Sequence, residues 1–189
     1  MIELSLHLLD MIQNSIEASA SKIEIRIDED LQADLLLIEI KDNGRGLSEE
    51  QTARVLDPFY TTRKTRHVGL GLPLLSEACR RCDGALEIRS QPGAGTTIRG
   101  TFRHRHVDRA PLGDMTSVLL ALLLSEHPLD WLYIHRVDEE EFRLDSSEIQ
   151  KELMDIPLTH PKVRKWLMGF WAEAENGLSI RALPARVGA

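Results

Sequence analysis

Three short polar stretches interrupt an otherwise regular apolar pattern in this chain of 189 residues, and they constrain its fold more than any other feature. They are residues 10–14 (DMIQN), 42–46 (DNGRG) and 59–71 (FYTTRKTRHVGLG). Each joins charged or amide side chains to a helix or strand pattern, and two of them contain paired glycines. The fold therefore has to bury the apolar residues on either side of these stretches and leave the polar side chains of the stretches accessible.

The first stretch lies on a predicted helix over residues 3–19. Apolar residues recur on one face, and polar residues follow at three- and four-residue steps on another: His7, Asp10, Asn14 and Glu17. Such a stripe is most often the solvated side of an amphipathic helix. Asp10 and Asn14 are one turn apart, however, so a carboxylate and an amide could together position a water and a Mg²⁺ ion, which prefers oxygen ligands.

The second stretch closes a predicted pair of strands. Residues 22–28 alternate apolar and polar, and residues 35–41 are apolar after a polar turn, so we expect the two to pair antiparallel. Asp42 ends the second strand, directly before Gly44 and Gly46. A carboxylate fixed there, beside glycines that allow a close approach, could accept a hydrogen bond from an exocyclic amine such as that of adenine. Taken alone, Asp-Asn-Gly favours a plain tight turn.

The third stretch leads into a helix over residues 72–82. Residues 61–68 carry four basic side chains and no acidic one: Arg63, Lys64, Arg66 and His67. Gly69 and Gly71 follow directly. Basic side chains, glycine amides and a helix N-terminus all favour bound phosphate, whereas a charge run by itself is most often a solvated loop.

Local signals place three further elements. Ser48 is a suitable N-cap for a short helix that ends near Leu56. Residues 85–90 and 96–103 have the pattern of two strands joined by a glycine-containing turn.

Two other groups contain possible metal ligands. Cys79 and Cys82 form a lone Cys-x-x-Cys without a second pair, so we interpret them as buried thiols without chemistry. His104, His106 and Asp108 alternate and could face one way. A metal site is conceivable there, but the pattern favours an exposed strand edge that leads into a linker.

Composition changes near Pro111 and Gly113, so we divide the chain into a domain of residues 1–108 and a small α+β module of residues 109–189. The module is predicted to contain a helix over 115–126 capped by Asp114, a hairpin of 130–136 and 141–144, a short helix with a capping box of Asp145 and Glu148, and a last helix capped by Thr159. Its aromatic residues fit a core or a partner surface better than a cofactor site: Trp166, Phe170 and Trp171. We expect this module to bind a protein partner.

Composition excludes several classes of protein. A net charge of −7 is unfavourable for broad nucleic-acid binding, which needs a basic face. Two cysteines give no disulfide framework and suit a reducing cytoplasm. The longest apolar run, residues 118–124, is too short to span a bilayer, and Glu3 and Asp10 interrupt any apolar leader. We therefore expect a cytoplasmic protein that binds neither nucleic acid nor a membrane.

Taken in order, the motifs resemble those of the GHKL ATPase superfamily, which includes gyrase-type, chaperone, histidine-kinase-like and mismatch-repair ATPases. The likeness covers residues 3–103. Five segments carry it: 10–18 as the N-box, 42–46 as the first glycine box, 57–62 as the aromatic box, 69–72 as the second glycine box and 93–96 as the closing Gly-x-Gly-Thr strand. The resemblance implies an α/β (α+β) two-layer sandwich of the Bergerat type with a mixed, mostly antiparallel sheet. The C-terminal extension is similar to that of small stand-alone bacterial ATP-binding proteins often encoded beside iron-hydrogenase or quinone-reductase-like subunits.

The resemblance also implies ligands and the residues that hold them. Asn14 would bind a Mg²⁺ ion that bridges the phosphates of ATP, and Asp42 would recognise adenine with support from Thr96. Gly44 and Gly46 would give the nucleotide room. The phosphates would be held by the segment after the aromatic box and by the second glycine box: Thr61, Thr62, Arg63, Lys64, Arg66, Gly69, Leu70, Gly71 and Leu72.

Asp10 stands where the gyrase-type and mismatch-repair branches place a glutamate general base. An aspartate is one methylene shorter, which limits its reach toward a water molecule. Three functions stay open at this point. The chain could be a Mg-ATP-binding switch with slow ATPase activity, a cytoplasmic protein kinase that phosphorylates histidine or serine on a separate partner, or a non-catalytic assembly module that binds ATP or ADP. Nothing in the sequence specifies an oligomeric state.

Overall fold

The computed structural model describes residues 3–57, 71–125 and 128–182, with side chains as far as residue 178. Helices and strands lie within a few residues of the predicted ones. In chain order they are α1 (Leu4–Glu17), β1 (Lys22–Asp30), β2 (Leu35–Asp42), α2 (Glu49–Arg54), α3 (Gly71–Arg81), β3 (Leu86–Gln91), β4 (Gly95–Arg103), α4 (Met115–Leu123), β5 (Asp130–Val137), β6 (Glu140–Asp145), α5 (Ser146–Leu153) and α6 (Pro161–Ala182).

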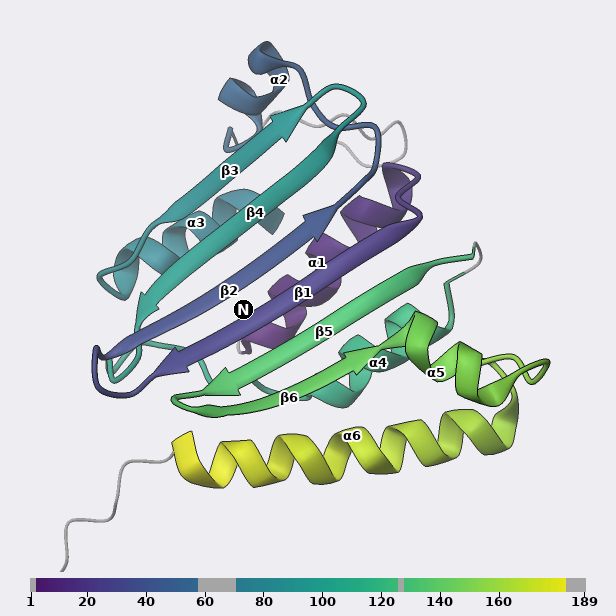
Figure 1. The fold of residues 1–189 in the computed structure, drawn as a ribbon. Helices are drawn as coiled ribbons and strands as arrows, with labels where there is room; N and C mark the ends of the chain where they lie inside the picture. The colour runs from purple at the N-terminus through teal and green to yellow at the C-terminus, as the bar shows by residue number, and fades with distance from the viewer. Residues whose placement is uncertain (1–2, 58–70, 126–127, 183–189) are drawn as a thin grey trace, which may run out of the picture.

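The six strands form one sheet in the order β3-β4-β2-β1-β5-β6 (Figure 1). Neighbouring strands are antiparallel except β1 and β5, which run parallel. The predicted hairpin of β1 and β2 is confirmed, with Ile25 opposite Ile40. The predicted two-layer fold with a mixed, mostly antiparallel sheet is confirmed as well.

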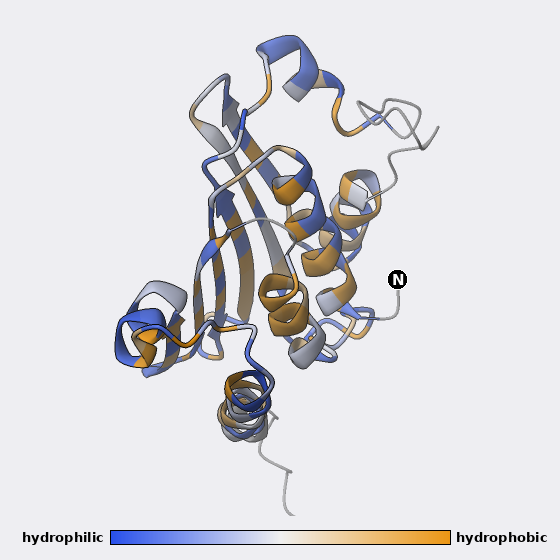
Figure 2. Cartoon of the chain, turned by 90° about the vertical axis from the view of Figure 1, so that its right-hand side faces the viewer, coloured by the Kyte–Doolittle hydropathy of each residue, from blue (hydrophilic) through white to orange (hydrophobic). Residues whose placement is uncertain are grey.

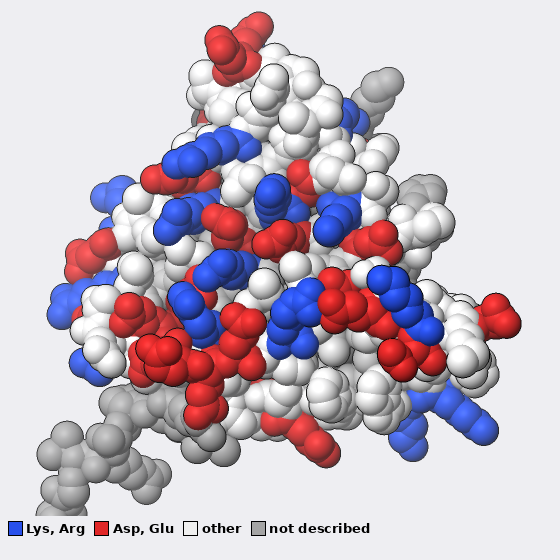
Figure 3. All heavy atoms as spheres, viewed as in Figure 1, with Lys and Arg blue, Asp and Glu red and all other residues white. Residues whose placement is uncertain are grey.

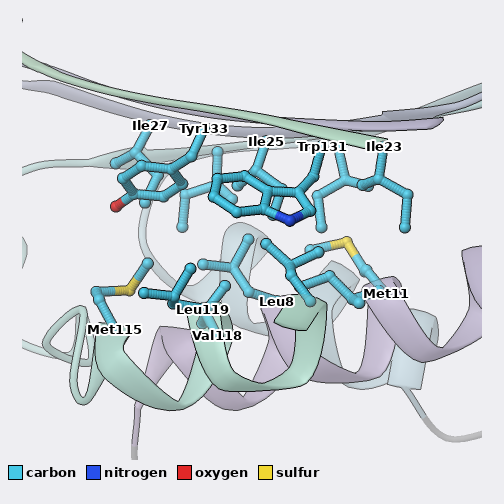
Figure 4. Close-up of a cluster of buried hydrophobic side chains, with 14 of the residues drawn as sticks. Leu8, Met11, Ile23, Ile25, Ile27, Met115, Val118, Leu119, Trp131 and Tyr133 are labelled. Atoms are coloured by element: carbon cyan, nitrogen blue, oxygen red, sulfur yellow. The ribbon is translucent and has the colours of Figure 1, made fainter. Parts of the chain in front are cut away.

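Helices α1, α3 and α4 cover one face of the sheet, with their apolar sides turned toward it (Figure 2). The alternation of apolar residues along β1 sends every second side chain into this layer, where all three isoleucines of the strand are fully buried. Figure 4 shows strand and helix side chains meeting in this core: Ile23, Ile25, Ile27, Trp131 and Tyr133 from the strands, and Leu8, Met11, Met115, Val118 and Leu119 from the helices.

The other face of the sheet carries charged side chains of both signs (Figure 3). The strand register places Glu39 of β2 opposite both Arg26 of β1 and Arg99 of β4, and it places Glu87 of β3 opposite Arg99. Arg26 also forms an ion pair with Asp28 at 2.6 Å. Opposite charges on neighbouring strands stabilise a solvated sheet face. This face is therefore mixed in charge, unlike the basic face that nucleic-acid binding needs.

The segment after residue 108 extends the same sheet. β5 pairs with β1, β6 forms the edge, and α4 lies beside α1 in the same helical layer. α6 runs along this edge and packs against α4, β5 and β6 (Figure 1). The expected C-terminal module thus shares its sheet and its hydrophobic core with the N-terminal part. The division of the chain into two domains at residue 108 stays a prediction.

Two helix caps differ from those expected. α6 begins two residues after Thr159, because residues 157–160 form a turn of their own closed by a backbone hydrogen bond of 2.9 Å. Asp145 does cap α5, but Glu148 bonds Arg143 at 2.9 Å instead of closing a capping box.

The segment that follows β4 also differs from the prediction. An exposed strand edge was the favoured interpretation of His104, His106 and Asp108, but His104 is buried and its Nε2 bonds Glu29 Oε2 at 2.6 Å. The chain turns directly after β4, so the alternation of the three residues does not place them on one face. Among the residues that the structure describes, no group of three His, Cys, Asp or Glu side chains is arranged to hold a metal ion.

His104 belongs to a buried polar network that ties α6 to the sheet. Glu29 of β1 accepts hydrogen bonds from His104 at 2.6 Å and from His135 Nε2 at 3.0 Å. The other ring nitrogen of His135 bonds Glu175 of α6 at 2.9 Å, and the Tyr133 hydroxyl donates to Glu175 at 2.7 Å. Since both ring nitrogens of His135 face carboxylates, the imidazole is held in its protonated form, with both N–H groups donating.

Both central groups of this network have shifted pKa values. Burial alone lowers the pKa of His135, but its hydrogen bonds with Glu175 and Glu29 outweigh burial and raise it to about 9. Burial alone raises the pKa of Glu29, but hydrogen bonds from His104 and His135 outweigh burial and lower it to about 2. Each charged group therefore stabilises the other inside the core.

We predict that this network gives stability that depends on pH. Folding raises the His135 pKa, so its contribution is complete below pH 6.5 and is lost as the pH rises through 9. Folding lowers the Glu29 pKa, so its contribution is complete above pH 4.5 and is lost as the pH falls through 2. The network therefore contributes most to the free energy of unfolding between pH 4.5 and 6.5. The shifted pKa of His135 accounts for roughly 3 kcal/mol of this contribution.

Urea unfolding at a series of pH values measures this effect. Glu175→Gln is expected to lower the free energy of unfolding at pH 6 and to flatten its decline toward pH 9, because Glu175 is a partner of His135. Glu152→Gln, on the exposed side of α5, is the matched control and should keep the wild-type profile. An unchanged profile in Glu175→Gln would contradict the assignment.

Candidate functional site

The carboxylate of Asp42 is the best-fixed polar group among the predicted site residues. It ends the central strand β2 and is only 7% exposed. Its Oδ1 accepts a hydrogen bond from the Gly44 backbone N–H at 2.8 Å, and its Oδ2 accepts one from the Ser15 hydroxyl at 2.9 Å. A carboxylate has about four acceptor positions, so this one can still accept a bond from a ligand amine.

Helix α1 supplies the next two groups. Asp10 and Asn14 are half-buried and one turn apart, and the Asn14 amide nitrogen donates to Asp10 Oδ2 at 3.5 Å. Ser15, which follows Asn14, turns toward the sheet and bonds Asp42. One helical turn therefore links the carboxylate at the end of β2 to the carboxylate and amide on α1.

The beginning of α3 lies directly beside Asp10. α3 starts at Gly71, and a Cβ atom at that position would overlap the Asp10 carboxylate. A larger residue at position 71 would have to displace the Asp10 side chain, so the glycine lets this carboxylate lie against the start of α3. Unpaired N–H groups and the positive end of the helix dipole lie at such an N-terminus, so it favours negative charge. Leu72, also predicted to contact the nucleotide, is half-buried and packs against the hydrophobic core.

Gly44 and Gly46 have a role within the protein itself. A Cβ at Gly44 would lie 2.8 Å from the Ala18 carbonyl oxygen, and Gly46 has a φ of +66° and would clash with the backbone of Gln91. The turn after β2 is therefore packed between the end of α1 and the β3–β4 turn. That these glycines also leave room for a nucleotide stays a prediction.

Thr96 lies opposite Asp42 in the register of β2 and β4. Its hydroxyl is 2.8 Å from that of Ser90 on β3, and Ser90 also accepts a hydrogen bond from the Leu47 N–H at 2.8 Å. Ser90 thus connects the β3–β4 hairpin to the turn that follows Asp42. The structure therefore brings Asp10, Asn14, Asp42, Gly71 and Thr96 into one connected region.

Sequence reasoning missed three residues that hold this region together: Ser15, Asn43 and Ser90. Asn43 Oδ1 accepts hydrogen bonds from the backbone N–H groups of Ser21 and Lys22, both at 2.9 Å, which fixes the turn to the start of β1. The position of Ser15 after Asn14, on the apolar side of the predicted helix, was the one available signal. A hydroxyl on that side has to find a buried partner.

The remaining predicted phosphate-binding residues lie outside the described part of the chain. They are Thr61, Thr62, Arg63, Lys64, Arg66, Gly69 and Leu70. Their roles stay predictions.

Cys79 and Cys82 are both free and buried on α3 and the turn after it. Burial raises the pKa of the Cys79 thiol to about 12 and shifts that of Cys82 in the same direction. Thiols with raised pKa values stay protonated at neutral pH and are poor nucleophiles and metal ligands. This supports their interpretation as packing residues.

More than half of this chain matches a known protein family. Residues 2–106 match the family model for histidine kinase-, DNA gyrase B- and HSP90-like ATPases, which is more than half of the chain. The chain belongs to this ATPase family. The match ends close to the end of β4, so the residues from α4 to α6 lie beyond it.

The similar curated proteins include bacterial sensor kinases. The chain is 31% identical to the sensor histidine kinase YxdK of Bacillus subtilis (strain 168), over 49% of this chain and 30% of the relative. It is 33% identical to sporulation kinase C of the same strain, over 48% of this chain and 21% of the relative. It is 32% identical to the non-motile and phage-resistance protein of Caulobacter vibrioides, over 54% of this chain and 13% of the relative. The chain thus spans less than a third of these relatives.

Among solved structures, the N-terminal domain of a DNA repair protein has a similar fold. The TM-score is 0.52 at 16% sequence identity, and the similarity covers 77% of this chain and 53% of that one. At this identity the likeness concerns the fold alone.

No helix in the described ranges is long and apolar enough to cross a membrane.

We predict that Ser15→Ala weakens the binding of adenine nucleotides by about tenfold or more, because a charged acceptor loses one of its two fixed donors. Isothermal titration calorimetry measures the affinity. Ser5→Ala is the matched control, since Ser5 is equally buried on the same helix but bonds Glu3. Equal affinities in the two variants would show that Ser15 does not act through Asp42.

Proposed function

We propose that this chain binds Mg-ATP in the region formed by α1, the end of β2 and the start of α3, and that it hydrolyses ATP slowly as a nucleotide-dependent switch. Membership of the ATPase family supports nucleotide binding. The single observation that carries the proposal is the buried Asp42 carboxylate, held by Ser15 and Gly44 and still able to accept from a ligand amine.

In this proposal each end of the region binds a different part of the nucleotide. Asp42 accepts a hydrogen bond from the adenine amino group, with Thr96 beside it. The N-terminus of α3 at Gly71 faces the phosphates, where its N–H groups and dipole favour negative charge. Asn14 is an oxygen ligand for Mg²⁺, which neutralises phosphate charge when bound. The two groups suit different parts of ATP, since a carboxylate can accept a hydrogen bond from the adenine amine and a helix N-terminus favours the negative phosphates.

Asp10 is the proposed general base. It lies at the start of α3, one turn from Asn14, which is where a water that attacks the terminal phosphate would need to be held. Its short side chain limits its reach, so we expect slow turnover. A switch also needs a partner, and the proposed binding region for a protein partner is the segment of residues 109–189.

A protein kinase is the second candidate, and one observation favours it. The curated relatives include proteins named as sensor histidine kinase and sporulation kinase. The chain matches less than a third of those relatives. In this candidate function, phosphate passes from ATP to a histidine or serine of a separate protein. A third candidate, a non-catalytic assembly module, differs from the first only in the absence of turnover.

Three measurements test and separate these candidates. Calorimetry with ATP and ADP, with and without Mg²⁺, tests nucleotide binding, and the absence of any binding would overturn all three. Phosphate release then distinguishes a switch that turns over from an assembly module. Transfer of label from γ-labelled ATP to another protein isolates the kinase.

We predict that Asn14→Ala weakens Mg-dependent ATP binding by more than about a hundredfold, because it removes the proposed oxygen ligand. Calorimetry in the presence of Mg²⁺ measures the loss. Gln13→Ala is the matched control, since Gln13 is the neighbouring amide but is exposed and bonds Glu17. Near-normal affinity in Asn14→Ala would remove the metal-binding assignment.

We further predict that Asp10→Asn keeps ATP affinity within a few fold while turnover falls by about a hundredfold or more, the usual contribution of a general base. Phosphate release at saturating ATP measures this. Glu17→Gln, on the same stripe of α1, should leave turnover unchanged. If hydrolysis survives in Asp10→Asn, another group activates the water.

A further inference from the structure

The exposed side of α6 carries aromatic rings, glycines and charged residues that packing within the chain does not account for. The helix buries one side, where Leu167 and Trp171 are fully inaccessible. One flank of its exposed side presents Trp166, which is 56% exposed, and Phe170, which is 43% exposed. Of the three tryptophans in the chain, Trp131 and Trp171 are buried and only Trp166 reaches solvent.

The two exposed rings are already ordered. Trp166 and Phe170 are one turn apart and stack with centroids 5.6 Å apart and an interplanar angle of 11°. Phe170 also contacts Phe142 of β6 edge-to-face at 5.7 Å. A pre-ordered aromatic pair loses little conformational entropy on binding, and tryptophan is enriched among the residues that dominate interface energies.

Two glycines on the same face have no role within the chain. Gly169 and Gly177 lie inside α6, and a Cβ atom added at either position would meet nothing within 4 Å. Glycine is among the least favourable residues in a helix interior. The conformation does not require it here, since neither residue has a positive φ. A helix backbone that approaches from outside does give a reason, because small residues allow two helices to come close.

The charges on this face are arranged symmetrically about Gly169. Lys165 lies four residues before Gly169 and Glu173 four residues after it, each about 6 Å along the axis. All three are exposed, and neither charged residue forms an ion pair with any of the described residues. Figure 3 shows the same order, with basic atoms toward the start of α6 and acidic atoms farther along.

We propose that this face binds the same face of a second copy of this chain, with the two α6 helices antiparallel and a twofold axis near Gly169. The pairing places Lys165 of each copy at the level of Glu173 of the other, so both charge pairs form at once. It also places Gly169 of one copy opposite Gly169 of the other, where neither residue has a side chain to hold the helices apart. Such a self-complementary patch is what an isologous dimer requires.

The occupant is a second copy because the face is complementary to itself. A partner with a uniformly acidic or basic helix would meet Lys165 or Glu173 with a like charge. The exposed stripe from residue 162 to residue 177 is about 24 Å long, so the interface lies at the small end of the usual range. We therefore expect a reversible dimer with a dissociation constant in the micromolar range.

Sedimentation equilibrium of the full chain, over protein concentrations up to about 0.5 mM, tests the proposal. Lys165→Glu or Glu173→Lys alone should raise the dissociation constant by about tenfold or more, since each change creates two like-charge contacts per dimer. The double variant with both changes should return to within about threefold of wild type. Lys151→Glu, an exposed charge reversal on α5, is the matched control and should have no effect.

Gly169→Leu separates dimer disruption from misfolding. Leucine raises helix propensity, so the variant should unfold at the same or a higher temperature while it remains monomeric. Iodide quenching of Trp166 in the wild type should decrease as the protein concentration rises, because dimerisation covers this one exposed tryptophan. A wild-type chain that is monomeric throughout, or a dimer unaffected by the α6 variants, would overturn the proposal.

Discussion

One buried hydrogen bond ties helix α1 to the end of β2, and these two elements carry three of the predicted site residues, Asp10, Asn14 and Asp42. The Ser15 hydroxyl of α1 donates to the Asp42 carboxylate at the end of β2, in a buried position. α1 otherwise contacts the sheet through apolar side chains, whose packing fixes distance but not direction. The hydrogen bond fixes the direction, because a buried carboxylate has to keep its donors. Asp10 and Asn14 on the same helix are thereby positioned relative to Asp42.

The glycines around this bond matter because they have no Cβ atom, which would overlap neighbouring atoms. Gly71 allows α3 to begin against Asp10, and Gly44 and Gly46 allow the turn after β2 to lie between α1 and the β3–β4 hairpin. Backbone approaches backbone closely around Gly44 and Gly46, whereas at Gly71 the Asp10 carboxylate lies where a Cβ atom would stand. The glycine motifs that resemble nucleotide-binding motifs in the sequence therefore also shape the turn after β2 and the contact between Asp10 and α3.

The second half of the chain completes the fold. β5 pairs in parallel with β1, and Glu29, His135 and Glu175 connect β1, β5 and α6 through buried charged hydrogen bonds. Breaking one partner of such a network leaves an uncompensated charge in the core. α6 is thus held on its inner side by polar contacts, while its outer side presents ordered aromatic rings to solvent.

Much of the fold could be predicted from local pattern. The alternation in residues 22–28, the N-cap at Ser48 and the cap at Asp114 all correspond to observed elements, because strand periodicity and capping depend on neighbours in sequence. The predicted Thr159 cap and the predicted capping-box role of Glu148 were wrong because nearby residues offered other hydrogen bonds. His104 was placed wrongly because its partner, Glu29, lies 75 residues away.

The sequence by itself determined the order of the motifs, the approximate positions of the helices and strands, and the candidate side chains at Asp10, Asn14 and Asp42. Only the tertiary structure decided that Ser15 and Ser90 hold this region, that β5 lies beside β1, and that His135 is clamped between two carboxylates. The reason is physical. Periodicity and capping are short-range, whereas buried polar partners are chosen by packing among residues far apart in the chain, and no local pattern records that choice.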